Sequence, residues 1–262
     1  MNILFWNLNK NPITNHVVDC LIENNIDLAL FSEYINIDFD EIESKTDYKH
    51  IENVGGCNKI TMLALPKIKM FVQAEYSRFI LYSFLFDNKQ YNVAGIHLED
   101  RRNDPDGVLR LSTIRDVTNS ILEVEEKFYC DNTLVIGDFN ANPFDKELLQ
   151  VDAFNAVLFK EIISRRDIKC INNKSYKRFY NPTLNFLSES TKNYGSFYYN
   201  QSFNTPIWNS FDQIIVRKPL MDLIEEVCYL RKIGSKSLIN SIKPNKKISD
   251  HLPLIVKLTE GE

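Results

Sequence analysis

The apolar residues of the chain fall into short runs, and several of these runs end at a polar residue. Such runs predict strands at residues 3–6, 28–31, 60–65, 70–73, 79–86, 91–96 and 134–136. Further strands are predicted near the other end of the chain, at 213–216, 227–230 and 254–258. A continuous apolar run is typical of a strand that is buried on both faces of its sheet.

Two other segments carry the spacing of a helix. Residues 107–128 repeat apolar side chains with a period close to 3.6, and residues 17–22 do so behind a turn at 9–15. Strands that are joined sometimes by helices and sometimes by tight turns imply mixed sheets, so the pattern predicts an α/β or α+β sandwich with helices outside. No repeat or Pro/Gly/Ser-rich linker divides the chain, and one domain over residues 1–262 is expected.

Residues that can bind a metal or transfer a proton follow several of the predicted strands. The segment LVIGDFN, for example, ends in Asp138 and Asn140. Buried strands deliver their ends to one edge of a sheet, where open α/β folds bind ligands. Taken singly, each residue also has an ordinary structural explanation, because Asp and Asn commonly form turns. Their joint occurrence favours a site made of Asn7, Asn9, Glu33, His97, Asp138, Asn140, Asp212, Asp250 and His251.

These residue types suit the hydrolysis of a phosphate ester. Glu33 and Asp250 offer the hard oxygen ligands that Mg²⁺ prefers, and a bound metal offsets charge that develops on a phosphoryl group. Asp138 can position or deprotonate a water molecule. Asp212 can hold His251 in one tautomer, as carboxylates do in other acid–base histidine pairs.

Composition narrows the class of protein without naming a partner. The 262 residues are 44% hydrophobic and 25% charged, which is ordinary globular usage. The start of the chain lacks the pattern of a secretory signal, and no apolar run is long enough for a membrane span. Five widely spaced cysteines without a CxxC motif argue against a disulfide framework or zinc knuckle, so a cytoplasmic protein is expected. The net charge of −4 excludes a strongly basic coat for nucleic acid, but a metal site could still bind phosphate.

Six motifs occur in an order that resembles a known superfamily. They are FWNLN, LFSEY, IHL, IGDFN, FDQIIV and SDHLPLIV, and they are spread over the whole chain. In type and order they resemble the endonuclease/exonuclease/phosphatase superfamily, which includes pancreatic deoxyribonuclease, abasic-site endonucleases, sphingomyelinases and inositol polyphosphate 5-phosphatases. The resemblance implies a four-layer α/β sandwich of two packed mixed β-sheets flanked by helices. It also implies phosphoester hydrolysis that depends on Mg²⁺, with Mn²⁺ as a substitute.

The resemblance also implies a role for each motif residue. The implied catalytic residues are Asn7, His97, Asp138, Asn140, Asp212 and His251, and the implied metal ligands are Glu33, Asp250 and Asn9. His97 matches the branch of the superfamily that carries histidine at this place, whereas abasic-site endonucleases carry tyrosine. Asn9 stands where some relatives carry aspartate, which weakens the case for a second metal contact.

The aromatic segment at 176–211 bears on the substrate. It holds eleven aromatic residues, with basic residues at 174, 177, 178 and 192 around its first half. Such a mixture can stack bases and follow a nucleic-acid backbone, although the aromatics could equally pack over the edge of the sandwich. Because the stretch FYYNQSFNTPIWNSFD resembles the aromatic loop of nuclease members, Tyr199 and Trp208 are the predicted substrate contacts. Arg101 could contact a phosphate or belong to a solvated charge run.

Three functions follow from these observations. The favoured one is a Mg²⁺-dependent nuclease whose substrate is DNA or RNA. The alternative is a phosphatase or phosphodiesterase for a phosphoinositide, lipid headgroup or nucleotide. A binding protein on an inactive enzyme fold is disfavoured, because every position of the site carries a competent residue. The sequence indicates no membrane anchor and identifies no protein partner.

Overall fold

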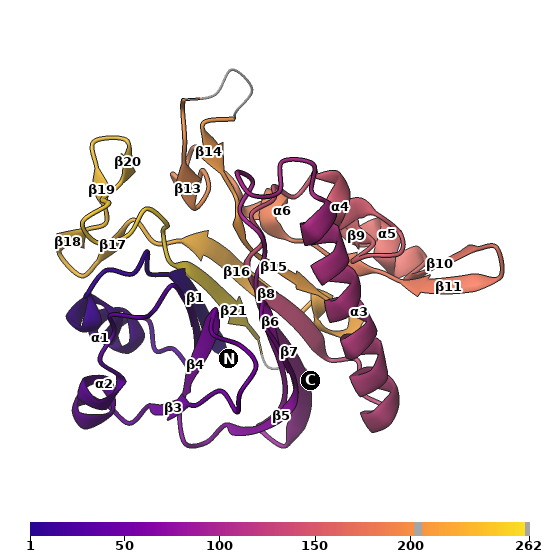
Figure 1. Cartoon of the computed structure of the whole chain (residues 1–262), viewed down its shortest axis with the longest axis horizontal. Coiled ribbons are helices and arrows are strands. Elements are labelled where there is room, and N and C mark those ends of the chain that lie inside the picture. The colour runs from indigo at the N-terminus through magenta and orange to yellow at the C-terminus, as the bar shows by residue number, and fades with distance from the viewer. Residues whose placement is uncertain (202–205, 260–262) are drawn as a thin grey trace.

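Two β-sheets pack face to face in the computed structural model, which describes residues 1–201 and 206–259 (Figure 1). The first sheet has six strands in the order β16-β21-β1-β2-β4-β3. Its strands are β1 (Asn2–Asn7), β2 (Leu28–Ser32), β3 (Lys49–Ile51), β4 (Ile60–Ala64), β16 (Ile224–Tyr229) and β21 (Leu254–Leu258). Strand β1 is parallel to β2 and antiparallel to β21, so this sheet is mixed.

The second sheet has seven strands in the order β5-β6-β7-β8-β15-β12-β9. They are β5 (Lys69–Tyr76), β6 (Phe79–Phe86), β7 (Lys89–His97), β8 (Thr133–Asp138), β9 (Ala156–Val157), β12 (Phe179–Tyr180) and β15 (Asp212–Val216). Strand β7 runs parallel to β8, and β15 runs antiparallel to it. This sheet is therefore mixed as well.

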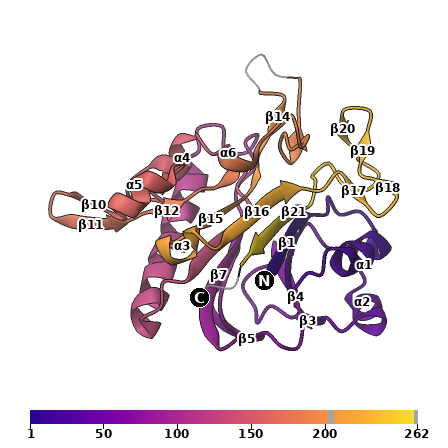
Figure 2. The same ribbon diagram turned by 180° about the vertical axis from the view of Figure 1, so that it is seen from behind.

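Helices lie on the outer faces of the two sheets (Figures 1 and 2). The first sheet is flanked by α1 (Thr14–Glu23) and α2 (Phe39–Lys45), and the second by α3 (Val108–Phe128). Shorter helices are α4 (Lys146–Leu149), α5 (Lys160–Arg165), α6 (Thr183–Phe186) and α7 (Lys218–Met221). The predicted four-layer α/β sandwich of two mixed sheets flanked by helices is thus confirmed. Among the helices of the described ranges, none is both long and apolar enough to cross a membrane.

Strand β8 shows why the apolar runs are continuous. Its Leu134 and Ile136 belong to the core between the two sheets, whereas Val135 packs on the opposite face with Ile114 and Val117 of α3. Because side chains alternate across a strand, a sheet that is covered on both faces needs apolar residues at every position. The run can therefore turn polar only where β8 leaves the core, at Asp138.

Gly137, just before Asp138, allows strands β7 and β8 to approach closely. Its φ is +157°, and a Cβ there would lie 2.0 Å from the carbonyl oxygen of Ile96. We expect Gly137→Ala to lower the free energy of unfolding by about 3 kcal/mol, as measured by urea denaturation. Gly55→Ala is the matched control, since Gly55 has φ +151° but nothing within 4 Å of the added Cβ. Equal losses in the two variants would show that backbone strain, and not the Ile96 contact, sets the cost.

Candidate active site

The strand register places three predicted site residues in one row across the second sheet. In the parallel pair β7–β8, His97 is opposite Asp138, and in the antiparallel pair β8–β15, Asp138 is opposite Asp212. On the first sheet, Asn7 ends β1 opposite Ser32, which directly precedes Glu33. The Nδ2 of Asn7 donates a hydrogen bond of 3.1 Å to Oδ2 of Asp138, so the two sheets meet at this carboxylate.

Carboxylates and imidazoles alternate along this edge of the sandwich. The distances between nearest side-chain atoms are 4.0 Å from Glu33 to His97, 3.8 Å from His97 to Asp138 and 4.0 Å from Asp138 to His251. The series ends with 2.7 Å from His251 to Asp212. We call these five residues the acid–imidazole row. Its members come from the ends of five different chain segments, so only the folded chain assembles it.

Several hydrogen bonds hold the pair of His251 and Asp212 at the end of the acid–imidazole row. Nδ1 of His251 donates to Oδ2 of Asp212 over 2.7 Å, and both side chains are buried. Trp6 Nε1 donates to the carbonyl oxygen of His251, and the Ser196 hydroxyl accepts from the Asp212 amide. Burial acts to lower the pKa of His251, but the carboxylates of Asp212 and Asp138 raise it to about 10. The ring therefore carries a proton at neutral pH, with Nε2 facing Asp138.

His97 has the opposite electrostatic character. Burial lowers its pKa, and this effect exceeds the opposing influence of the Asp138 and Glu33 carboxylates. Its Nδ1 is buried and finds no hydrogen-bond partner within the described part of the chain. The row thus combines one neutral imidazole with one protonated imidazole, on either side of Asp138. Such a pair can contact a phosphate oxygen and a water molecule at the same time.

Three of the predicted site residues lie in left-handed backbone conformations, one or two residues after the ends of their strands. The φ angles are 49° at Asn9, 51° at Glu33 and 47° at Asn140. This conformation costs a residue other than glycine roughly 1 kcal/mol, so the surrounding contacts must enforce it. The amide of Asn140 donates to Oδ1 of Asp138 over 2.9 Å, and the amide of Asn9 donates to Oδ1 of Asn7 over 3.0 Å. The bends therefore orient the carboxylate of Asp138 and the side chain of Asn7.

The chemistry of the donor set fits a magnesium ion. The carboxylate of Glu33 is 27% exposed, and its charged contacts are long, 3.9 Å to Lys10 Nζ and 4.0 Å to His97 Nε2. Asp250 is half-buried beside His251, and its charge adds to the rise in that residue's pKa. Hard oxygen atoms at an accessible edge are what Mg²⁺ selects. Ligand atoms of Asp138, Asp212 and His251 also lie within 4.8 Å of one another. However, the hydrogen bond between Asp212 and His251 makes these two better suited to holding a proton.

The structure places the three predicted substrate contacts around this edge, each in a different setting. Arg101 donates from Nε to the carbonyl oxygen of Asn140, is ion-paired with Asp145, and covers the ring of Phe211. Trp208 is partly buried, whereas Tyr199 is 42% exposed. Tyr199 is therefore the more accessible of the two aromatic residues. Residues 202–205 of the aromatic segment lie outside the described residues.

Two basic residues around the first half of the aromatic segment, Lys174 and Lys177, lie on a separate hairpin. Lys177 pairs with Glu125 and Asp131, and it belongs to the hairpin of β10 (Ile168–Ile171) and β11 (Lys174–Lys177). Figure 1 shows this hairpin on the side of the molecule away from β13 (Phe197–Tyr198) and β14 (Trp208–Asn209). Lys174 and Lys177 therefore lie apart from the aromatic residues of β13 and β14.

Sequence reasoning also missed side chains that hold the acid–imidazole row in place. The ring of Phe197 lies 4.8 Å from that of His251, and the two residues form an isolated β-bridge. The hydroxyl of Ser249 donates to the carbonyl oxygen of Asn7 and accepts from the amide of His251. No sequence signal marked Phe197, whereas Ser249 stands inside the SDH motif and could have been included.

Comparison with known proteins identifies the fold. No family model and no curated protein sequence matches the chain. Among solved structures, D. rerio TDP2 in complex with a single-strand DNA product is 14% identical, with 99% of each chain covered and a TM-score of 0.61. The endonuclease domain of TRAS1, a telomere-specific non-LTR retrotransposon, is 11% identical, with 100% of this chain and 99% of that chain covered and a TM-score of 0.57.

A third structure extends the comparison to a human protein. The catalytic domain of human Nocturnin, with a bound sulfate anion, is 13% identical, with coverages of 99% and 94% and a TM-score of 0.59. The chain has the deoxyribonuclease I-like fold that these structures share. The resemblance to the endonuclease/exonuclease/phosphatase superfamily is thereby confirmed at the level of the fold.

Proposed function

We propose that this protein is a metal-dependent phosphodiesterase that cleaves nucleic acid. The observation that carries the proposal is the acid–imidazole row, in which Asp138 lies between a neutral and a protonated imidazole. Asn7 and Glu33 bring the other sheet to the same edge. A phosphate at this edge would meet hydrogen-bond donors, a base and a carboxylate that suits a metal ion.

Asp138 is the residue best placed to handle the attacking water. The Asn140 amide holds its Oδ1 and the Asn7 amide group holds its Oδ2, so the carboxylate cannot rotate freely. A fixed carboxylate can accept a proton from water as the water oxygen attacks phosphorus. The bond to the leaving oxygen then breaks, and that oxygen takes up a proton.

The two histidines would act on the phosphate itself. His251, protonated and held by Asp212, can donate from Nε2 to an oxygen that gains charge in the transition state. His97 can contact a second oxygen, and Asn140 a third. These roles for His97, Asp138, Asn140, Asp212, His251 and Asn7 remain proposals.

Glu33, together with Asp250 and Asn9, would hold Mg²⁺ at the edge of the sandwich where the row lies. The metal would supply positive charge next to the phosphate.

The five cysteines are free, which supports a reducing compartment, and we propose the cytoplasm as the location.

Nucleic acid is the preferred substrate for two reasons. One structural neighbour, TDP2, was solved with a single-strand DNA product, and another is an endonuclease domain. In this chain, the aromatic residues of β13 and β14 stand beside the row, and base stacking on such rings stabilises a bound strand.

The direct test is cleavage of labelled single- and double-stranded DNA and RNA with Mg²⁺ or with chelator. We expect cleavage that chelator abolishes and that Mn²⁺ also supports. If no polymer is cleaved but phosphate or a headgroup is released from an inositol phosphate, nucleotide or lipid, the smaller-substrate alternative replaces the nuclease.

The pairing of Asp212 with His251 gives a separate prediction. When two residues act as a unit, the losses of activity caused by substituting each of them are not additive. Asp212→Asn combined with His251→Ala should therefore lower kcat/KM little more than His251→Ala alone. We expect the double variant to lie within about threefold of the single one in kcat/KM. Losses that multiply fully would show that the two side chains act independently.

A further inference from the structure

A strongly basic segment borders the candidate active site. Residues 231–247 contain six basic residues and no acidic one, in a chain whose acidic residues outnumber the basic ones by 35 to 31. The six are Arg231, Lys232, Lys236, Lys243, Lys246 and Lys247. We call this segment the basic arm.

The basic arm has a defined structure of two small hairpins. They are β17 (Lys232–Ile233) with β18 (Lys236–Ser237), and β19 (Ile239–Asn240) with β20 (Lys243–Pro244). Buried Ile233, Leu238 and Pro244 anchor the hairpins, whereas all five lysines are exposed. The lysines are therefore presented to solvent by a folded support, and their positions are restricted.

The basic arm is attached to the active-site edge at two places. The Nδ2 of Asn11, shortly after Asn7 and Asn9, donates to the carbonyl oxygens of Lys246 and Ile248 over 3.1 and 3.0 Å. Strand β20 lies beside β13, which carries Phe197 next to His251 (Figure 1). The chain runs from the arm directly into Ser249, Asp250 and His251.

The basic arm also contacts aromatic residues near the site. The guanidinium of Arg231 lies 5.5 Å from the ring of Tyr194 and 6.0 Å from the ring of Trp208. Positive charge and stacking surfaces are therefore contiguous here, which is the arrangement that binds single nucleic-acid strands. An anionic lipid surface would use the charge but would have no need of these rings.

Most of the positive charge of the arm is not neutralised by the protein. Lys236 pairs with Asp19 over 2.7 Å. The other four lysines have no carboxylate oxygen within 4.0 Å of their ammonium groups in residues 1–201 and 206–259. Clustered like charges destabilise a fold, so an unneutralised cluster beside a phosphate site indicates an anionic ligand.

We propose that the basic arm binds the phosphodiester backbone of a nucleic-acid strand, on one side of the phosphate that is cleaved. This inference rests on the proposed function and refines it, because it assigns a polymer and not a small phosphoester to the site. A small substrate held by the acid–imidazole row would not extend to Lys232 or Lys243. A strand several nucleotides long would reach the arm and the aromatic rings together.

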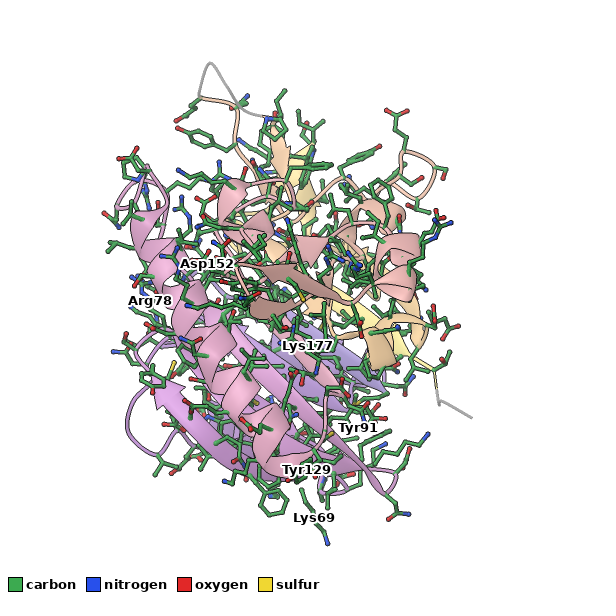
Figure 3. The ribbon with its side chains drawn as sticks, turned by 90° about the vertical axis from the view of Figure 1, so that its right-hand side faces the viewer. Lys69, Arg78, Tyr91, Tyr129, Asp152 and Lys177 are labelled. Atoms are coloured by element: carbon green, nitrogen blue, oxygen red, sulfur yellow. The ribbon has the colours of Figure 1, made fainter. Side chains whose placement is uncertain are left out.

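The test compares two variants that lose the same charge. The arm variant is K232Q/K243Q/K246Q/K247Q, and the control variant is K69Q/K127Q/K169Q/K174Q. The control lysines lie on β5, α3, β10 and β11, and Figure 3 places Lys69 at the end of the molecule remote from the arm. Binding of a fluorescent 20-nucleotide strand is followed by anisotropy in chelator, with circular dichroism as a check of folding.

We expect the arm variant to bind the strand about 100-fold more weakly than wild type at 0.1 M salt. The slope of log K against log salt should be shallower by about 3, because four phosphate contacts are lost. The control variant should change Kd by less than about threefold. Equal losses in the two variants would overturn the proposal, since only net charge would then matter.

Two further measurements separate this inference from the proposed function. Cleavage of the labelled strand by wild type with Mg²⁺ reports on the acid–imidazole row separately from strand binding. If wild type binds the strand but does not cleave it, while the arm variant alone loses strand binding, the proposed function fails and the binding assigned to the arm stands. If phosphatidylserine vesicles, and not the strand, lose binding in the arm variant, the arm serves a membrane and the proposal fails. The exposed Ile242 at the tip of β19–β20 would then be its insertion point.

Discussion

Asp138→Asn is expected to lower the rate of phosphodiester hydrolysis by about 10³-fold and to leave the fold intact. The substitution removes the charge of the carboxylate that lies between His97 and His251, with Oδ2 at 3.8 and 4.0 Å from their Nε2 atoms. An asparagine can still accept the hydrogen bond from the Asn140 amide through its Oδ1, so the backbone should not move. Its Nδ2 would face Nδ2 of Asn7, and the hydrogen bond between these two side chains would be lost. What is lost is a base for the attacking water and, beside the larger effect of Asp212, one of the charges that raise the pKa of His251.

The measurement is kcat on a labelled strand at saturating Mg²⁺, with thermal unfolding as a check of stability. Asp152→Asn is the matched control, because Asp152 is an exposed surface residue paired with Arg115 (Figure 3). We expect Asp152→Asn to retain full activity. If Asp138→Asn retains activity within about threefold of wild type, the base has been assigned wrongly.

Glu33→Gln should weaken metal binding by about 100-fold. Glutamine has nearly the same shape and can occupy the left-handed conformation at a similar cost, so the change removes mainly the charge of the carboxylate. Titration calorimetry with Mg²⁺ and with Mn²⁺ measures the affinity directly, without reference to turnover. Activity at low Mg²⁺ should fall, and added metal should restore part of it.

The control for this change is Glu126→Gln on the exposed face of α3. Its metal affinity should equal that of wild type. An unchanged affinity in Glu33→Gln would instead direct attention to the cluster of Asp138, Asp212 and His251 as the metal centre.

The strand ends could be predicted from sequence because burial dictates them. In β8 a fully apolar run stops at the residue that leaves the core, and the same reasoning marked Glu33 after β2 and His97 at the end of β7. The long amphipathic helix was predicted at 107–128 and observed as Val108–Phe128, since one face of α3 packs on the second sheet. These features depend on local patterns.

Other parts of the site depend on pairing between distant segments. Asp138 lies beside Asp212 because β8 and β15 are neighbours in the second sheet. The two residues are separated by 73 residues of sequence, and no local pattern predicts that their strands pair. The basic arm was missed because each strand of its hairpins is two residues long. The position of Lys174 and Lys177 could not be predicted either, because the β10–β11 hairpin sets them apart from the aromatic residues of β13 and β14.

The position of β21 has a consequence for how the protein matures. Strand β21 lies between β16 and β1, so the first sheet is incomplete until residues Leu254–Leu258 have left the ribosome. His251 and Asp250 are synthesised only just before them, whereas Asn7 and Glu33 emerge early. A nascent chain therefore cannot assemble the acid–imidazole row before residues 250–258 have been synthesised.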